Sequence, residues 1–268
     1  MTKSPFRFHY CKLAVISSVL LAGCAQSPTG RDQILMFSTN EMSQLGSQSF
    51  EQLKQQERIS TDKAVNQYVQ CVANSITNIV GTRPGFEQWE VVVFDSEQVN
   101  AFALPGGKIG VYTGLLNVTK TEDQLASVIG HEIGHVLANH SNERLSRSQL
   151  AGLGLQVASV AVQGSGYGEY HDLTMAGLGL GVQYGVLMPY GRSQESESDI
   201  IGVQLMNQAG YDPNASIELW KNMAKISGEQ PPEFLSTHPS HNTRIGELSE
   251  EINRLPSNQV SKPNCKRP

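Results

Sequence analysis

The stretch VIGHEIGHVLANH, residues 128–140, decides how the rest of the 268-residue chain is interpreted. Its apolar residues recur at the three- and four-residue spacing of one helical face, which predicts a helix packed on a core. Residues four apart on a helix lie one turn above each other, so His131 and His135 can point both imidazoles at one metal ion. Glu132 stands beside them, within reach of a water bound to that ion. The sequence therefore predicts a metal site on this helix.

The order His-Glu-x-x-His is typical of zinc peptidases, in which the glutamate serves as the general base. Thr121 and Gln124 form a capping box just before the segment and support a helix there. The alternative is a pair of core histidines satisfied by hydrogen bonds. His140 follows His131 by nine residues, about half a turn round a continuous helix, so we expect it to pack or cap rather than bind the same ion.

A catalytic zinc ion usually has three protein ligands and one open position. No third histidine follows closely, so the acidic candidates lie in GRSQESESDIIG, residues 191–202. Glu195 and Asp199 are four apart and share a helical face. This favours Glu195 as the third ligand and Asp199 as the acceptor of the free N–H of a zinc-bound imidazole. Glu197 points about 200° away from Glu195, so we interpret it as a solvated residue near a helix start.

Periodicity and turn signals divide the rest of the chain into short elements. Residues 148–168 and 173–191 contain no Asp, Glu, Lys or Arg, and each is long enough to span a bilayer. Because Gln and Gly recur in both and QGSGYGEYHD interrupts them, we favour two apolar helices packed in the fold over membrane insertion. Further helices are predicted at 41–57, 61–80, 193–208, 214–227 and 243–255, and strands at 89–96 and within 101–114.

The first 23 residues have the pattern of a secretory signal peptide, with three basic residues before an apolar run at 13–23. The residues Leu21-Ala22-Gly23-Cys24 resemble a bacterial lipobox, which implies cleavage before Cys24 and lipidation of its thiol. Ala25 follows in place of the aspartate that commonly retains such lipoproteins in the inner membrane, which implies an anchor on the periplasmic side of the outer membrane. The alternative is an ordinary cleaved signal with a chance cysteine.

Cysteine usage and composition bound the remaining possibilities. Once the signal and Cys24 are set aside, Cys71 and Cys265 remain, and our hypothesis is a disulfide between them, with two free thiols as the alternative. Residues 24–40 are predicted to be a lipidated tether, 41–256 the folded domain and 257–268 a flexible tail. The formal net charge is -5 and no basic stripe or nucleic-acid motif appears, so a nucleic-acid partner is excluded.

Taken together, the motifs resemble those of the HtpX-like and CAAX-prenyl-protease-like zinc metallopeptidases, a branch of the glutamate zincins. The resemblance covers nearly the whole mature chain. The segments that carry it are HEIGH (131–135), Glu195-x-x-x-Asp199, STHPSHNTR (236–244), NAFALPGGKIGVYTGLL (100–116), and TGRDQ (29–33), the last similar to the start of the bacterial lipoprotein and Oma-like members. It implies an α+β fold, a mostly helical, minigluzincin-like zincin core with a small β-sheet preceding the His-Glu-x-x-His helix.

Carried over position by position, the resemblance also implies roles for single residues. The zinc ligands, for one ion per chain, are His131, His135 and Glu195, and Glu132 is the general base. The other implied residues are His238, which stabilises the oxyanion, Asp199, Arg244, which orients the site, and Asn100, Ala101, Phe102 and Ala103, an edge strand that pairs with an extended substrate. Ser198 departs from the family, in which alanine usually precedes the aspartate.

The function implied by the resemblance is a zinc endopeptidase of the cell envelope that cleaves misfolded or unassembled proteins and works beside assembly partners. In this hypothesis the apolar helices between 148 and 191 cover the cleft. The rival is a non-catalytic, chaperone-like or assembly lipoprotein that keeps zinc only as a structural ion. Glu132 favours the enzyme, because a carboxylate beside the ligands has no role in a structural zinc cage.

Overall fold

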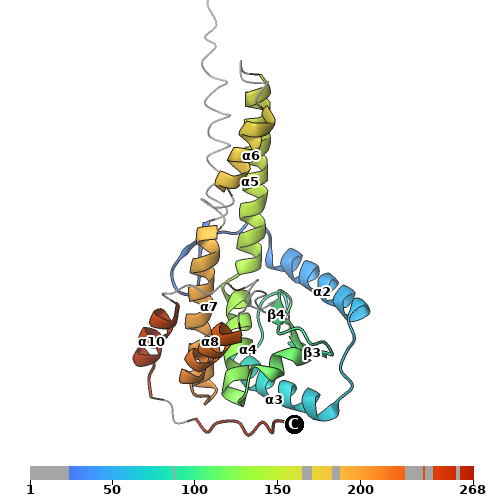
Figure 1. Ribbon diagram of the computed structural model, residues 1–268, viewed down its shortest axis with the longest axis vertical. Helices are drawn as coiled ribbons and strands as arrows, with labels where there is room; N and C mark the ends of the chain where they lie inside the picture. Colours follow the sequence, from blue (N-terminus) through green and yellow to red (C-terminus); the bar gives the residue numbers. More distant parts are fainter. Residues whose placement is uncertain are drawn as a thin grey trace, which may run out of the picture.

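A computed structural model describes residues 24–86, 88–164, 171–182, 188–226, 238, 244–257 and 260–268 of the chain. Figure 1 shows a body of helices around a small sheet, from which two paired helices project. This arrangement confirms the predicted α+β, mostly helical fold class. The helices of the described part are α2 (Thr39–Gln56), α3 (Lys63–Val80), α4 (Glu122–Leu137), α5 (His140–Gln163), α6 (His171–Val182), α7 (Met188–Gln208), α8 (Asn214–Ile226) and α10 (Arg244–Arg254), with a 3-10 turn, η1, at Thr113–Asn117.

Side-chain caps explain where the first helices begin. Ser38 and Glu41 form a reciprocal capping box at the start of α2. The carboxylate of Asp62 accepts from two backbone N–H groups at the start of α3. Thr121 accepts from the backbone N–H of Gln124 and so starts α4, the predicted metal-binding helix, where the sequence places it.

The sheet that precedes α4 has three strands, β3 (Glu90–Phe94), β4 (Ala101–Leu104) and β5 (Lys108–Tyr112), in the order β3-β5-β4. β3 runs parallel to β5, and β4 runs antiparallel to it through the turn at Pro105-Gly106-Gly107. Gly106 and Gly107 both have positive φ, 87° and 72°, which glycine adopts without strain. β4 therefore lies at the edge of this sheet, and it packs along α4.

Helices α4 and α7 touch backbone to backbone at three glycines. A Cβ atom added to Gly134 would lie 2.9 Å from the carbonyl oxygen of Ser198, and one added to Gly202 would lie 2.9 Å from the backbone nitrogen of His131. A Cβ atom added to Gly130 would likewise lie 3.0 Å from the carbonyl oxygen of Gly202. Because no side chain separates the two helices here, residues of α7 can reach the histidines of α4.

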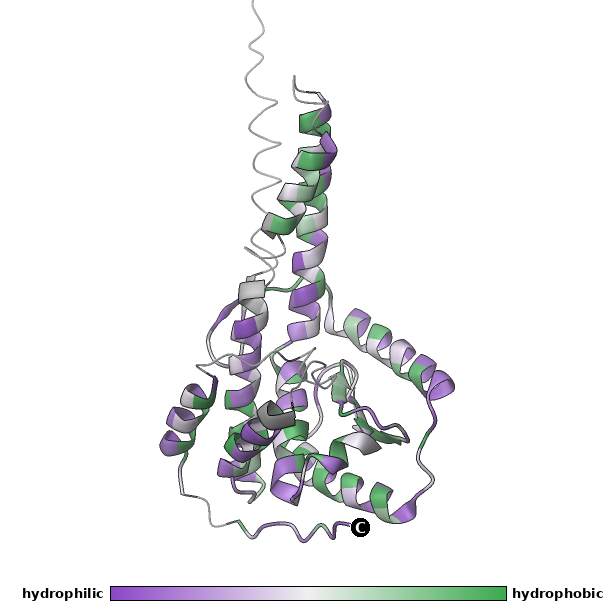
Figure 2. Ribbon diagram, viewed as in Figure 1, coloured by the Kyte–Doolittle hydropathy of each residue, from purple (hydrophilic) through white to green (hydrophobic). Residues whose placement is uncertain are grey.

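Helices α5 and α6 pair with each other and extend away from the body (Figure 1). The hydroxyl of Ser159 and Nε2 of His171, 2.8 Å apart, join them near the outer end. Figure 2 shows both hydrophobic and hydrophilic residues along these two helices. Val157, Val160 and Leu173 are more than 70% exposed. The described parts of these helices do not extend over the predicted cleft. Within the described residues, no helix combines the length and apolarity needed to cross a bilayer.

The segment predicted to be a tether is folded onto the body. Strands β1 (Cys24–Gln26) and β2 (Asp32–Ile34) form a two-stranded antiparallel sheet, and the turn between them is closed by backbone hydrogen bonds from Ser27 to Arg31. Gln33 is buried and donates to the carbonyl of Ala138 at the end of α4. Residues 24–34 form the N-terminal hairpin, and they lie against the helices that carry the metal motif.

The C-terminal tail also differs from its prediction, because residues 260–268 are fastened to the start of α4. Lys262 pairs with Glu122 and Asp123 at 2.9 and 2.6 Å. Cys265 is buried and forms a disulfide with Cys71 of α3, the pairing that the sequence suggested. The N-terminal hairpin and the C-terminal tail therefore contact opposite ends of α4.

Candidate metal centre

Four side chains from three parts of the chain converge at the middle of α4 and α7. His131 and His135 of α4, Glu195 of α7 and His238 are all buried, and they could hold a metal ion. Nε2 of His131 lies 3.1 Å from Nε2 of His135 and 3.3 Å from Oε2 of Glu195. Oε1 of Glu195 lies 3.4 Å from Nε2 of His135. The structure thus brings together the three residues predicted as ligands.

These separations fit a tetrahedral zinc ion. Zinc binds imidazole nitrogen and carboxylate oxygen at about 2.0–2.1 Å, which places neighbouring tetrahedral ligand atoms about 3.3–3.4 Å apart. The three distances between His131, His135 and Glu195 are within 0.3 Å of that range. Two neutral nitrogens and one carboxylate oxygen also form a common donor set for catalytic zinc.

His238 lies inside this group rather than beside it, which the sequence did not predict. Its Nδ1 atom is 3.0 Å from Oε2 of Glu195 and 3.2 Å from Nε2 of His131. Its other nitrogen, Nε2, lies 3.3 Å from Oε1 of Glu132. The His238 ring therefore stands between the candidate ligands and the candidate base.

Glu132 is placed for proton transfer rather than for structure. It is 3% exposed, and its Oε1 atom is buried without a hydrogen-bond partner among the described residues. A buried carboxylate oxygen without a hydrogen bond is costly unless a ligand, a substrate or water satisfies it. Its place next to the group of ligand atoms matches the position expected for a base.

Asp199 and Arg244 support His131 on the side of its ring that faces away from the other ligand atoms. Nδ1 of His131 donates to Oδ1 of Asp199 at 2.9 Å, which leaves Nε2 to face the other ligand atoms. Arg244, 1% exposed, bonds both oxygens of Asp199, and its Nη2 atom lies 3.3 Å from Oε2 of Glu195. The guanidinium packs 3.8 Å above the ring of Trp220. Asp199 thus lies where the sequence places it, and Arg244 orients both Asp199 and Glu195.

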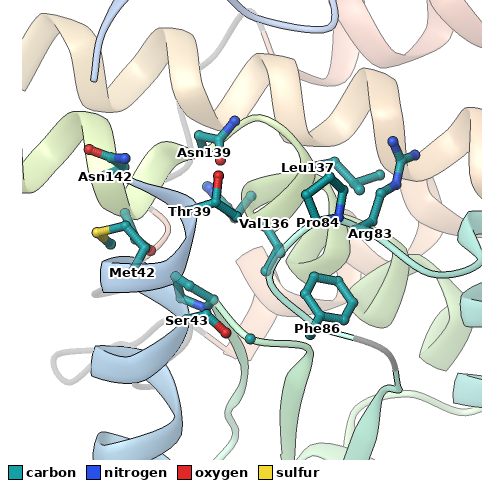
Figure 3. A pocket seen from close by; sticks show the side chains of 14 residues that line it. Thr39, Met42, Ser43, Arg83, Pro84, Phe86, Val136, Leu137, Asn139 and Asn142 are labelled. Atoms are coloured by element: carbon teal, nitrogen blue, oxygen red, sulfur yellow. The ribbon is translucent and has the colours of Figure 1, made fainter. Parts of the chain in front are cut away.

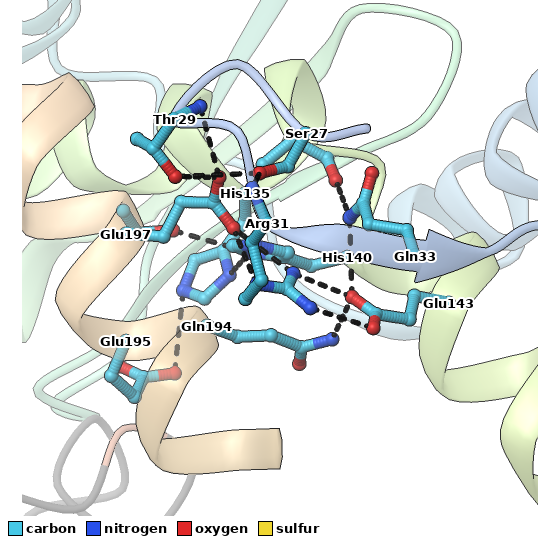
Figure 4. A network of polar contacts seen from close by, with 12 residues as sticks. Ser27, Thr29, Arg31, Gln33, His135, His140, Glu143, Gln194, Glu195 and Glu197 are labelled. Carbon is cyan, nitrogen blue, oxygen red and sulfur yellow. Dashed lines mark hydrogen bonds and ion pairs between the residues drawn. The ribbon is translucent and has the colours of Figure 1, made fainter. Parts of the chain in front are cut away.

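The second histidine is supported by residues that the sequence analysis assigned elsewhere (Figure 4). Nδ1 of His135 lies 2.7 Å from Nδ1 of His140, and Nε2 of His140 lies 3.1 Å from Oε2 of Glu197. Glu197 was expected to be solvated, but it is 3% exposed. His140 was placed on a continuous helix, but α4 ends at Leu137 and Asn139 has a left-handed φ of 54°, so the chain turns before His140.

The charges around the site follow from burial and from these partners. Burial opposes protonation of His131, but its hydrogen bonds to Asp199 and Glu195 outweigh that effect and raise its pKa to about 9 in the metal-free protein. Burial and the charge of His131 lower the pKa of His135 well below its usual value. Burial raises the pKa of Glu195, but hydrogen bonds with His131 and His238 dominate and lower it far below its usual range. The glutamate is therefore ionised, as a metal ligand must be.

The predicted substrate strand lies at the open edge of the sheet. Residues 101–103 belong to β4, and Asn100 precedes the strand, where its carbonyl accepts from the backbone N–H of Tyr112 at 3.1 Å. Hydrogen bonding alternates along an antiparallel pair. The backbone groups of Phe102 therefore point towards β5, while those of Ala101 and Ala103 point to the free edge. Those groups can bind an extended chain.

A cavity of about 240 Å³ lies at the end of this edge (Figure 3). Pro105 and Gly106, which follow β4 directly, contribute to its wall, together with His135. Figure 3 shows Met42, Phe86 and other side chains around it, from α2 and from the turn before β3. A chain extended along β4 would therefore reach a partly open pocket that His135 also lines.

The known proteins to which this chain is similar are named as proteases. The mitochondrial metalloendopeptidase OMA1 of Schizosaccharomyces pombe is 37% identical over 65% of this chain and 49% of its own length. The OMA1 protein of Danio rerio is 34% identical over 85% of this chain and 50% of its own length. The beta-barrel assembly-enhancing protease of Yersinia pestis is 30% identical over 72% of this chain and 40% of its own length. The chain thus spans half or less of the length of these relatives.

These relatives correct the predicted location. The position on the periplasmic side of the outer membrane, anchored through Cys24, is contradicted because the relatives from Schizosaccharomyces pombe, Arabidopsis thaliana, Saccharomyces cerevisiae and Danio rerio are all named as mitochondrial. The prediction rested on the signal-like first 23 residues, on the four residues Leu21-Ala22-Gly23-Cys24 and on Ala25, which are short patterns for locating a protein. Residues 21–23 lie outside the described part, and lipidation of Cys24 is not tested by it.

The family model for peptidase family M48 matches residues 63–252. This span contains α3, the sheet, the four clustered side chains and Arg244, and it leaves out the N-terminal hairpin and the C-terminal tail. The His-Glu-x-x-His helix and the predicted acidic ligand on α7 lie within the matched span. The chain therefore belongs to peptidase family M48.

Proposed function

We propose that this protein is a zinc-dependent endopeptidase that hydrolyses peptide bonds in unfolded, misfolded or unassembled proteins. The observation that carries the proposal is the buried set of His131, His135 and Glu195, whose ligand atoms have tetrahedral separations, with an unsatisfied Glu132 beside them. Membership of the M48 family and the names of the relatives support peptide hydrolysis. The same residues make zinc the expected metal, one ion per chain.

A zinc ion held by His131, His135 and Glu195 would supply Lewis acidity, which would make a water molecule more acidic and polarise the scissile carbonyl. Glu132 removes a proton from the attacking water, whose oxygen forms a bond with the carbonyl carbon. His238, 3.3 Å from Glu132, is close enough to donate to the oxyanion that develops. Glu132 then passes its proton to the leaving nitrogen as the carbon–nitrogen bond breaks. Asp199 and Arg244 keep His131 and Glu195 in place throughout.

The edge strand supports a preference for unfolded chains. Only an extended segment can form backbone hydrogen bonds with Ala101 and Ala103, because helices and folded loops have their own backbone groups already paired. The cavity beyond Pro105 would take a side chain of that segment. The expected result is fast cleavage of a permanently unfolded protein such as casein and slow cleavage of a tightly folded one. Equal rates on the folded and unfolded forms of one protein would contradict this preference.

The decisive experiment compares the parent with Glu132→Gln on casein in the presence of zinc. The variant keeps the size of the side chain but cannot accept the proton, so we expect cleavage to fall by about 10³-fold or more while zinc binding stays intact. Equal zinc content of the two proteins is the control. Cleavage that survives the substitution, or casein binding without cleavage by both proteins, would favour the rival reading of a non-catalytic, chaperone-like module.

A further inference from the structure

The contacts of His135 continue outward through the protein in a single chain. Its Nδ1 atom lies 2.7 Å from Nδ1 of His140, whose Nε2 atom lies 3.1 Å from Oε2 of Glu197. Glu197 in turn accepts from Nε and Nη2 of Arg31, both at 3.0 Å. Figure 4 shows these side chains aligned between α7 and the N-terminal hairpin. Arg31, 104 positions before His135 in sequence, is thus connected to it through His140 and Glu197.

The protonation states along this chain follow from its two ends. If Nε2 of His135 faces the metal, its Nδ1 must carry the proton and donate to His140. His140 then accepts at Nδ1 and must carry its own proton on Nε2, which donates to the carboxylate of Glu197. Every bond therefore has one donor and one acceptor.

The N-terminal hairpin holds Glu197, the carboxylate at the outer end of this series of hydrogen bonds. Thr29 donates from its hydroxyl to Oε1 of Glu197 at 2.6 Å, so both carboxylate oxygens are held by residues 29–31. Arg31 also bonds both oxygens of Glu143, at 2.8 and 2.7 Å, and thereby links Glu197 to α5. Glu143 is fully buried and Glu197 nearly so, which makes displacement of Arg31 costly for both.

The two histidines of α4 are supported in parallel ways. On the His131 side, the carboxylate of Asp199 accepts a hydrogen bond from the imidazole N–H and is itself bonded by Arg244. On the His135 side the carboxylate is Glu197 and the arginine is Arg31, with one extra imidazole between. We propose that Arg31 is a positioning residue of the metal centre, which holds His135 in its metal-facing orientation through Glu197 and His140. The N-terminal hairpin is on this view a working part of the site, and the inference rests on His135 being a ligand.

The test measures affinity for Co²⁺, a spectroscopic substitute for zinc, in the full chain by competition with a chelator. Removal of residues behind a metal ligand typically weakens binding by about 10–100-fold. We expect Arg31→Met to weaken Co²⁺ binding by about tenfold and to alter the visible absorption of the bound ion. We expect the same two effects from His140→Phe. Arg31→Lys, which keeps the charge, should recover part of the loss.

Arg147→Met is the matched control. Arg147 also pairs with Glu143, through Nε and Nη2 at 3.0 and 2.9 Å, but it has no hydrogen bond to Glu197 among the described contacts. Both variants remove one guanidinium from Glu143, so both should lower the melting temperature of the apoprotein, but only Arg31→Met should weaken metal binding. In the His140→Phe background, Arg31→Met should add no further loss, because its effect passes through His140.

The outcomes separate this inference from the proposed function. Co²⁺ binding by the parent that His135→Ala abolishes establishes the ligand independently of Arg31. If that holds and Arg31→Met binds within twofold of the parent, or Arg147→Met loses as much affinity, the positioning role is refuted and the proposed function stands. If the parent binds no Co²⁺, or His135→Ala binds it equally well, both fail.

Discussion

At the scale of single residues, the metal centre divides its tasks between neighbours on one helix. His131 and His135 face the candidate ion, while Glu132, between them in sequence, keeps one carboxylate oxygen without a hydrogen bond. His238 comes from a distant part of the chain, with Nδ1 3.0 Å from Oε2 of Glu195 and Nε2 3.3 Å from Oε1 of Glu132, a contact that is not a hydrogen bond. Three ligands are sufficient for catalytic zinc, so the task of His238 can be tested separately from theirs.

Replacement of His238 by Phe should reduce kcat much more than zinc affinity. Loss of one oxyanion donor costs about 10²–10³-fold in kcat, whereas the three remaining ligands should keep zinc affinity within about tenfold. Peptidase kinetics and zinc competition on the same preparation provide the two numbers. A loss of zinc affinity above 100-fold would show instead that His238 is a true ligand.

Glu143 should make stability depend on pH. Burial opposes its ionisation, but hydrogen bonds from Arg31, Gln194 and Arg147 outweigh that and lower its pKa to about 2. Because the folded pKa lies below the unfolded value, the ionised group stabilises the protein above pH about 4.5, by up to about 3 kcal/mol, and this contribution disappears as the pH falls towards 2. Urea unfolding at pH 6 and pH 3 should show a smaller difference in Glu143→Gln than in the parent.

The matched variant for this measurement is Glu218→Gln, which changes a carboxylate that is 61% exposed. Exposed substitutions usually change stability by less than about 0.5 kcal/mol, so its pH dependence should follow that of the parent. A Glu143→Gln curve parallel to the parent would show that the Arg31–Glu143 pair contributes nothing at either pH.

At the scale of elements, the contact between α4 and α7 sets the geometry of the site. Gly134, the glycine within HEIGH, and Gly202 of α7 let the two backbones meet, which brings Glu195 to the histidines. On α4 a ligand and a contact glycine share one turn, and on α7 they lie about two turns apart. Packing and metal binding are therefore coupled through the same few residues.

Gly202→Ala should force α4 and α7 apart. Its Cβ would lie 2.9 Å from the backbone nitrogen of His131, and overpacking of this kind costs about 1–3 kcal/mol. We expect a lower unfolding free energy and weaker zinc binding, measured by urea unfolding and metal competition. The control is Gly152→Ala in α5, which has nothing within 4 Å of the added Cβ and should be stabilised by about 0.5–1 kcal/mol. Unchanged zinc binding in Gly202→Ala would refute the coupling.

Local patterns predicted the helices and strands well, because caps, turns and periodicity act over a few residues. The capping at Thr121, the strand pair around Pro105-Gly106-Gly107 and the helix carrying Glu195 are placed as the sequence indicated. The N-terminal hairpin was missed because its partners, such as Glu143, are more than 100 residues away. Glu197 was misjudged for the same reason: the face it covers looks exposed until Thr29 and Arg31 fold over it.

At the scale of the whole molecule, the disulfide between Cys71 and Cys265, 194 residues apart in sequence, closes a loop that contains the four clustered side chains His131, His135, Glu195 and His238. Loop closure on this scale gives roughly 4–5 kcal/mol in the chain-entropy model. The double variant Cys71→Ala, Cys265→Ala should therefore unfold at lower urea concentration than the oxidised parent. A reductant should lower the stability of the parent and leave the variant unchanged. Two titratable thiols in the untreated, denatured parent would refute the bond.

The network that supports the metal centre also determines when the protein can first act. Arg31 lies near the beginning of the chain and Arg244 near its end, and each holds a carboxylate behind a candidate ligand. Contacts between residues so far apart in sequence form only after the intervening chain has collapsed. A ribosome must therefore have released the polypeptide at least as far as Arg244 before the centre can assemble. The proposed peptidase would in this way be kept inactive during its own synthesis, when its nascent chain is the nearest unfolded substrate.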